Sequence, residues 1–127
     1  MTKRNPNRIH ALLFGLSDDL AGELLRPLAQ FCADVRAVAR KSTADGDSIQ
    51  QVSESSAQII FCGANVDTVN QLRTAKPDAS IVVVSRHPEV SDWLDSIEAG
   101  ASDYCAAPFE TSQVKWILES SLRLHTA

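Results

Sequence analysis

Short apolar segments alternate with amphipathic segments along the chain. Five of the apolar segments have the length and composition of β-strands: 11–14, 35–38, 59–62, 81–84 and 103–106. The first, third and fourth are continuously apolar and bounded by turn-forming residues, which is typical of strands covered on both faces in a parallel sheet. In the second, Arg36 lies between apolar neighbours, so this segment is predicted to be an edge strand.

The segments between the strands have helical patterns. Ser17 can cap a first helix whose first turn contains Asp18 and Asp19, because carboxylates there interact favourably with the helix dipole. Pro27 is expected to kink this helix, since proline removes one backbone hydrogen bond. A weaker second helix is predicted after the turn at 45–47.

The three later helices have clearer boundaries. The third is predicted to end before Pro77, and the fourth to begin with Pro88 and to be terminated by Gly100. Four apolar residues recur at helical spacing in the fourth helix: Val90, Trp93, Leu94 and Ile97. We expect Trp93 to contribute to the core. The fifth helix is predicted from about Thr111, a candidate N-cap, with an inward stripe that contains Val114, Ile117, Leu118 and Leu122.

Five strands that alternate with five helices predict a doubly wound α/β domain, because parallel neighbours need right-handed helical crossovers. The expected strand order is 2-1-3-4-5. A chain of 127 residues with 44% hydrophobic composition fits one domain. We expect this domain to span 9–127 and the polar residues 1–8 to be disordered or extended.

Charge and composition argue against several classes of protein. A net charge of -4 and a pI near 5.2 oppose binding to a phosphate backbone, so no nucleic-acid partner is expected. The basic residues of segment 1–8 are not followed by an apolar segment, and no apolar stretch approaches the roughly 20 residues that cross a bilayer. We therefore expect a cytoplasmic location without membrane contact. The cysteines at positions 32, 62 and 105 are widely spaced, which predicts neither a disulfide framework nor a zinc site.

The most specific signal lies in segment 80–109. A β-branched strand there ends in the hydroxyl residue Ser85, and the later run 100–109 reads Gly-Ala-Ser-Asp-Tyr-Cys-Ala-Ala-Pro-Phe. This segment resembles the corresponding part of the response regulator receiver domains of two-component signalling. The resemblance covers essentially the whole chain after Ile9, and it implies the flavodoxin-like receiver fold with the strand order given above.

Receivers form an aspartyl phosphate at the carboxyl ends of their first, third and fourth strands. They use an acidic pair that holds a divalent metal, an acceptor Asp, a Ser or Thr, and a Lys before a proline. By this resemblance, Cys62 occupies the acceptor position and Ala107 the lysine position, whereas Ser85 and Tyr104 match the switch positions. The resemblance further implies a cis peptide bond before Pro108.

The position of the acidic pair is also substituted. An ungapped match places Gly15, Leu16 or Ser17 there, and none of these provides the anionic oxygens that Mg²⁺ prefers. We therefore predict no metal site. A shift of two residues would bring Asp18 and Asp19 into the pocket, but it would use up the cap and first-turn acids of the helix, so it is the less favoured alternative.

These substitutions predict a degenerate receiver, or pseudo-receiver, that is not phosphorylated on Asp, is not an enzyme and binds no cofactor. The resemblance implies a regulatory role in a phosphorelay, through a protein partner or an output domain. A homodimer through the fourth helix, fifth strand and fifth helix is also considered. Trp116 lies off the inward stripe of the fifth helix and is a candidate interface residue, with partial burial as the alternative.

The sequence also bears on two other functions. A redox or anion sensor could use Cys62, Ser85 and Arg86 in the vacated pocket, although a buried structural thiol and a hydroxyl bonded to backbone are the more ordinary interpretations. A flavodoxin-like cofactor carrier is rejected, because no phosphate-binding loop rich in Gly, Ser and Thr follows the first strand.

Overall fold

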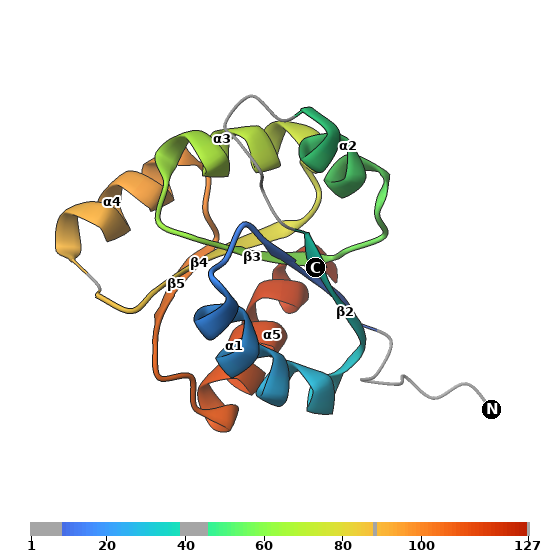
Figure 1. Cartoon of the computed structure of the whole chain (residues 1–127), viewed down its shortest axis with the longest axis vertical. Helices are drawn as coiled ribbons and strands as arrows, with labels where there is room; N and C mark the ends of the chain where they lie inside the picture. The colour runs from blue at the N-terminus through green and yellow to red at the C-terminus, as the bar shows by residue number, and fades with distance from the viewer. Residues whose placement is uncertain (1–8, 39–45, 88, 127) are drawn as a thin grey trace.

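A parallel sheet of five strands forms the middle layer of the protein, with helices on both faces (Figure 1). The computed structural model describes residues 9–38, 46–87 and 89–126, and it describes their side chains except at 46–47 and 121–126. The predicted N-terminal segment 1–8 and the predicted helix start at Pro88 lie outside the described residues, as does the side chain of Leu122. In chain order the elements are β1 (Ile9–Phe14), α1 (Asp18–Phe31), β2 (Cys32–Val38), α2 (Gly46–Glu54), β3 (Ile59–Cys62), α3 (Val66–Ala75), β4 (Ser80–Ser85), α4 (Val90–Ala99), β5 (Asp103–Ala106) and α5 (Thr111–Thr126).

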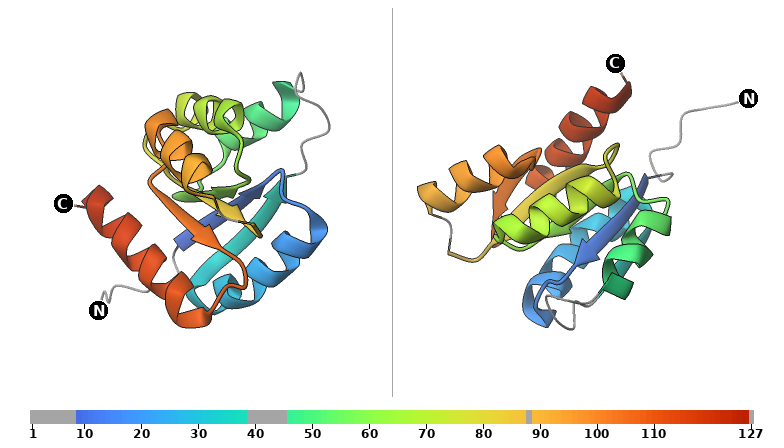
Figure 2. Two further views of the ribbon diagram at one scale, coloured as in Figure 1. Left: turned by 90° about the vertical axis from the view of Figure 1, so that its left-hand side faces the viewer. Right: turned by 90° about the horizontal axis from the view of Figure 1, so that it is seen from above.

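The strand order is β2-β1-β3-β4-β5, and every neighbouring pair is parallel. This confirms the predicted doubly wound topology, with β2 at one edge. The helices α2, α3 and α4 lie on one face of the sheet, and α1 and α5 lie on the other (Figure 2). Among the described residues, no helix combines the length and the apolar character that a membrane crossing requires.

Each face of the sheet has its own apolar cluster. On one face, Leu24 and Leu28 of α1 pack with buried residues of α5 and of the strands. On the other face, Val52 of α2 packs with Val69 and Leu72 of α3 and with the alternate strand residues. The central strands contribute to both clusters, which explains why β3 is buried along its whole length.

The two helices of the first face begin where local sequence predicts. The side-chain oxygen of Ser17 accepts a hydrogen bond from the Leu20 N–H at 3.4 Å, so Ser17 is the N-cap of α1. The helix continues through the buried Pro27 to Phe31, so the proline does not interrupt it. In α5 the helix already includes Thr111, and the cap therefore lies one residue before the predicted position.

The helix α4 differs from the expectation for its apolar residues. Trp93 is 46% exposed, so its predicted place in the core is wrong. The buried residue of α4 is Ser96, and Ala99 is partly buried against the cluster beneath. Small side chains let this face of the helix approach its neighbours closely, and the larger apolar residues remain outside. Periodicity identified the apolar stripe, but it did not determine which face of α4 packs against the rest of the domain.

Hydrogen bonds from Arg73 of α3 hold the C-terminal end of α4 in place. Its guanidinium donates to the Gly100 carbonyl at 2.6 and 3.2 Å, to the Pro77 carbonyl at 2.9 Å and to the Ala79 carbonyl at 2.9 Å. Gly100 has a φ of 117°, and a β-carbon added there would lie 3.3 Å from Arg73 Cγ. Gly100 is therefore required both for its left-handed backbone and for the close approach of Arg73.

The exposure of α4 predicts which substitutions the fold tolerates. Leu94→Ser is expected to change the free energy of unfolding by less than about 0.5 kcal/mol, because Leu94 is 49% exposed. Leu72→Ala is the matched comparison, and it is expected to cost about 2–5 kcal/mol because Leu72 is fully buried. Urea denaturation measures both. A loss above about 2 kcal/mol for Leu94→Ser would place the α4 stripe in the core.

Removing the Arg73 contacts is expected to destabilise the protein. Arg73→Leu leaves the carbonyls of Pro77, Ala79 and Gly100 without their donor, and the expected loss is about 1–3 kcal/mol in urea denaturation. Lys115→Met, at an exposed position of α5, is the control and should stay within about 0.5 kcal/mol of the unchanged protein. Equal effects of the two variants would contradict a fastening role for Arg73.

Candidate functional site

The strand register brings the predicted pocket residues to one edge of the sheet. Cys62 ends β3 and is aligned with Phe14 of β1 and Val83 of β4. Ser85 ends β4 and is aligned with Ala106, and the Ala107 N–H donates to the Ser85 carbonyl at 2.9 Å. Ligand sites of doubly wound sheets lie at this carboxyl edge, which makes it the candidate functional site of this chain.

Cys62 is fully buried at this edge. It belongs to the apolar cluster that also contains Phe14 and Val83, and no part of it is exposed. Burial raises the pKa of the Cys62 thiol from an ordinary value of 9.0 to about 12. The thiol is therefore protonated at neutral pH, and it offers neither a nucleophilic thiolate nor a metal ligand.

The other positions of the predicted pocket offer little charge. The Ser85 side-chain oxygen accepts a hydrogen bond from the His87 N–H at 3.1 Å, which is the backbone contact of a structural hydroxyl. Ala107, which the resemblance assigns to the lysine position of receivers, offers only a methyl group. The peptide bond between Ala107 and Pro108 is cis, the form that the resemblance implies.

Tyr104 is a half-buried residue of β5 that packs against the cluster on the α3 side of the sheet. Its hydroxyl is buried and has no hydrogen-bond partner among the described residues. An unpaired buried hydroxyl costs about 1–3 kcal/mol. The ring is therefore held by apolar packing and not by a polar contact with Ser85.

The two residues of the alternative acidic pair line a groove at the surface of the protein. Asp18 and Asp19 are exposed in the first turn of α1. They line a groove of about 710 Å³ between α1 and the segment after β5, together with Pro108 and Phe109. Neither Cys62 nor Ser85 lines this groove. In the described part of the chain, no group of three or more His, Cys, Asp or Glu side chains could hold a metal ion.

An ion pair connects the loop after β4 to α1. A guanidinium nitrogen of Arg86 lies 2.6 Å from a carboxylate oxygen of Glu23, and the two side chains are 42% and 39% exposed. An exposed pair of this kind contributes less than about 1 kcal/mol to stability. It nevertheless occupies Arg86, which the sequence had suggested as an anion ligand. Sequence reasoning missed Glu23, because nothing in the sequence pairs a residue of the first helix with the fourth strand's loop.

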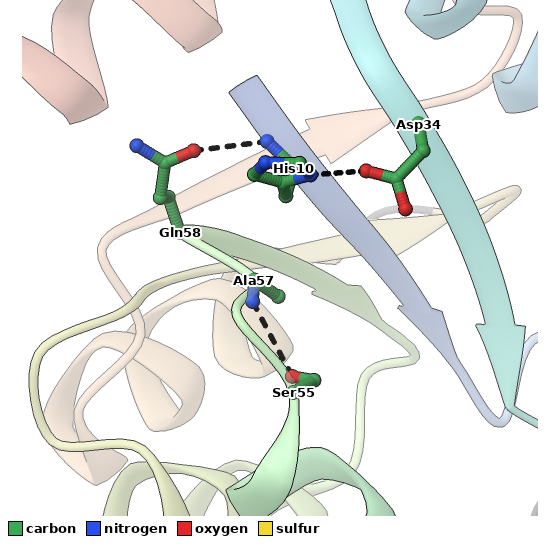
Figure 3. A network of polar contacts seen from close by, with 5 residues as sticks. All are labelled: His10, Asp34, Ser55, Ala57 and Gln58. Carbon is green, nitrogen blue, oxygen red and sulfur yellow. Dashed lines mark hydrogen bonds and ion pairs between the residues drawn. The ribbon is translucent and has the colours of Figure 1, made fainter. Parts of the chain in front are cut away.

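A second polar network lies at the opposite edge of the sheet (Figure 3). The His10 side chain of β1 forms an ion pair with Asp34 of β2. The Gln58 side-chain oxygen accepts a hydrogen bond from the backbone N–H of His10 at 2.9 Å. Nearby, the Ser55 side-chain oxygen accepts from the Ala57 N–H at 3.4 Å. These contacts join the starts of three strands, and they lie away from the edge where the predicted pocket residues meet.

Comparisons with known proteins agree with this fold. No family model matches the chain. The photosynthetic apparatus regulatory protein RegA from Rhodovulum sulfidophilum is 32% identical over 59 residues, which are 46% of this chain and 32% of that protein. The matched part thus spans about a third of the length of this curated relative.

Solved receiver structures superpose over nearly the whole chain. A response regulator protein from Burkholderia pseudomallei, solved with a phosphorylated aspartic acid, a calcium ion and citrate, is 19% identical. Its TM-score is 0.73, with 94% of this chain and 74% of that chain covered. The beryllofluoride-activated NtrC4 receiver domain dimer is 14% identical with a TM-score of 0.73, and 91% of this chain and 98% of that chain are covered. The chain therefore has the fold of a response regulator receiver domain.

Proposed function

We propose that the chain is a regulatory domain of two-component signalling that is not phosphorylated on Asp and works by binding a protein partner or an output domain. The receiver fold and the partial match to the regulatory protein RegA support the signalling role. The main support for the absence of phosphorylation is the state of Cys62, whose thiol is fully buried and neutral at the end of β3.

Aspartyl phosphorylation needs a carboxylate nucleophile, oxygen ligands for a divalent cation and a positive charge that stabilises the phosphoryl group. Cys62 replaces the nucleophile and Ala107 replaces the cation. Asp18 and Asp19 line the groove beside α1, which does not include Cys62. Binding of partners therefore remains as the mode of action, and no catalytic residue is proposed.

A redox or anion sensor at the same edge is the less favoured function. A reactive thiol needs exposure and a lowered pKa, whereas Cys62 is buried and its pKa is raised to about 12. Arg86 would be the anion ligand, and it is paired with Glu23.

A second copy of the chain is another candidate partner, through the face made by α4, β5 and α5. Trp116 of α5 is 62% exposed, and tryptophan is a common anchor of protein interfaces. The NtrC4 receiver domain, which has the same fold, was solved as a dimer. A homodimer and a complex with a different protein would both agree with an interaction module.

The proposal predicts that phosphoryl analogues and metal ions have no effect. Addition of Mg²⁺ with beryllofluoride should leave the backbone amide resonances of Gly15, Gly63 and Ser85 unchanged, and Mn²⁺ should not broaden them selectively. The response regulator from Burkholderia pseudomallei, which was solved with a phosphorylated aspartic acid and calcium, is the positive control. Selective broadening at these amides would show a metal site and would contradict the proposal.

The cysteines are predicted to be inert in the folded protein. Burial raises the pKa of the Cys32 and Cys105 thiols to about 11, and that of Cys62 to about 12, so the thiolate fraction at pH 8 is about one in a thousand or less. Iodoacetamide at pH 8 should therefore label the three thiols only after denaturation. Rapid labelling of Cys62 in the folded protein would contradict this prediction and would favour the function as a redox sensor.

The same thiols make stability depend on pH in a defined direction. Their pKa values are raised in the folded protein, so the unfolded chain loses its thiol protons first, and stability falls as the pH rises above about 9. Each thiol adds about 1.4 kcal/mol per pH unit to this fall up to its folded pKa. Chemical denaturation between pH 8 and pH 10 tests this, with Cys62→Ala as the comparison. An unchanged slope in Cys62→Ala would contradict the raised pKa of Cys62.

A further inference from the structure

The surface of α4 has an apolar stripe that the domain itself does not cover. Four residues at helical spacing are exposed, to 70%, 46%, 49% and 39% in chain order: Val90, Trp93, Leu94 and Ile97. Among the residues whose side chains the structure describes, the other exposed large apolar residues are single on their helices: Leu25 on α1, Val66 on α3 and Trp116 on α5. A contiguous exposed apolar patch with a polar border marks an interaction site, whereas single exposed residues are ordinary.

The position of α4 leaves this stripe open to a partner. The helix lies at the outer end of the layer that it forms with α2 and α3, so a helix of the same layer flanks it on one side only (Figure 1). The strand β5 beside it is the edge strand of the sheet. The small residue Ser96 faces inward, and the Arg73 contacts to Gly100 hold the end of the helix. The stripe is therefore presented outward by a fixed helix.

The charges around the stripe have one sign. Residues 89–99 contain four carboxylates and no lysine or arginine: Glu89, Asp92, Asp95 and Glu98. The ion pairs among the described residues are His10 with Asp34 and Arg86 with Glu23, so none of them neutralises a carboxylate of α4. The nearby Arg73 binds backbone carbonyls. Within the described part of the chain, the carboxylates beside the stripe therefore have no ion-pair partner.

This charge selects among the occupants that could cover the stripe. In a symmetric contact of two copies through α4, the carboxylates of one helix would face those of the other, and each chain carries a net charge of -4. A segment with Lys or Arg beside its apolar residues would instead meet charges of opposite sign at the exposed Glu89, one turn before Trp93, and Glu98, one turn after Leu94. Apolar residues repeating along one face of a helix can pack against the α4 stripe at the same spacing.

We propose that the α4 stripe docks an amphipathic helix of another polypeptide, with apolar residues along one face and basic residues along its borders. This inference rests on the proposed function as an interaction module, and it names the chemistry of the partner. The ten residues of α4 span about 15 Å. This surface is smaller than the roughly 800 Å² per partner of a standard interface, so binding is weak and reversible, and it weakens further as salt screens the charges.

Two synthetic helical peptides test the proposal. Both carry leucines at positions i, i+3, i+4 and i+7, and the bordering positions are Lys in one peptide and Glu in the other. Binding to the whole chain is followed by amide resonances, and by Trp93 fluorescence in a Trp116→Phe background. The Lys peptide is expected to shift the resonances of α4 and to bind at least tenfold more tightly than the Glu peptide, with affinity that falls as salt is added.

Matched variants separate the stripe from the rest of the surface. Leu94→Asp is expected to weaken binding of the Lys peptide at least tenfold, whereas Leu25→Asp, at a similarly exposed leucine of α1, should leave it unchanged. Glu98→Lys changes only a charge at an exposed position, so it remains informative if Leu94→Asp does not fold. It is expected to weaken the Lys peptide and to strengthen the Glu peptide.

Four outcomes would overturn the inference, and the absence of peptide binding is one of them. Equal binding of the two peptides would remove the charge argument, and shifts confined to other elements would place the docking site elsewhere. Shifts of α4 that appear on raising the concentration of the chain alone would make a second copy the occupant. The beryllofluoride titration is run on the same samples. If beryllofluoride shifts the resonances while the Lys peptide still binds, only the proposed absence of phosphorylation is overturned. If beryllofluoride has no effect and the Lys peptide does not bind, only the docking inference is overturned.

Discussion

The central strands are apolar on both faces, and they stay out of water only because a layer of helices covers each face. Ile60 and Phe61 illustrate this constraint, since consecutive residues of β3 belong to opposite clusters and both are buried. The helices must therefore be distributed over both faces, which right-handed crossovers between parallel strands provide. The same arrangement aligns the strand ends at one edge and determines which residues meet there.

At that edge the chain has the backbone arrangement of a receiver, and its side chains form mainly structural contacts. Where phosphoryl transfer needs a hydrated, charged pocket, β3 ends in a thiol that packs among apolar side chains. Ser85 is bonded to the backbone of its own loop, and Arg86 is paired with Glu23 of α1. Ser85 and Arg86 therefore each have a structural contact and the Cys62 thiol is uncharged, which supports the proposal that this edge holds neither a phosphoryl group nor a metal ion.

The helix α4 shows how a fold can keep a surface available for binding. Its amphipathic pattern is directed outward, and the contacts that hold it involve small side chains and the backbone carbonyl of Gly100. Because Arg73 donates hydrogen bonds to the Gly100 carbonyl and to two carbonyls of the connection between α3 and β4, the position of α4 does not depend on burial of its apolar residues. The stripe can thus remain exposed without loss of the fold.

Local sequence was sufficient for the five strands, the Ser17 cap of α1 and the Gly100 terminus of α4, because hydrophobic periodicity and capping chemistry act over a few neighbouring residues. The strand order was expected from the alternation of strands and helices and from the resemblance to receivers, and the structure confirms it. The assignment of Cys62 and Ala107 to the acceptor and lysine positions comes from the resemblance to receivers, and it stays a prediction. Tertiary structure decided what periodicity cannot: that Trp93 faces solvent, that Glu23 meets Arg86, and that Arg73 reaches Gly100. The reason is physical. A helical pattern defines which residues share a face of the helix. Folding alone brings distant segments together, and these segments determine which face becomes buried and which partners the long charged side chains find.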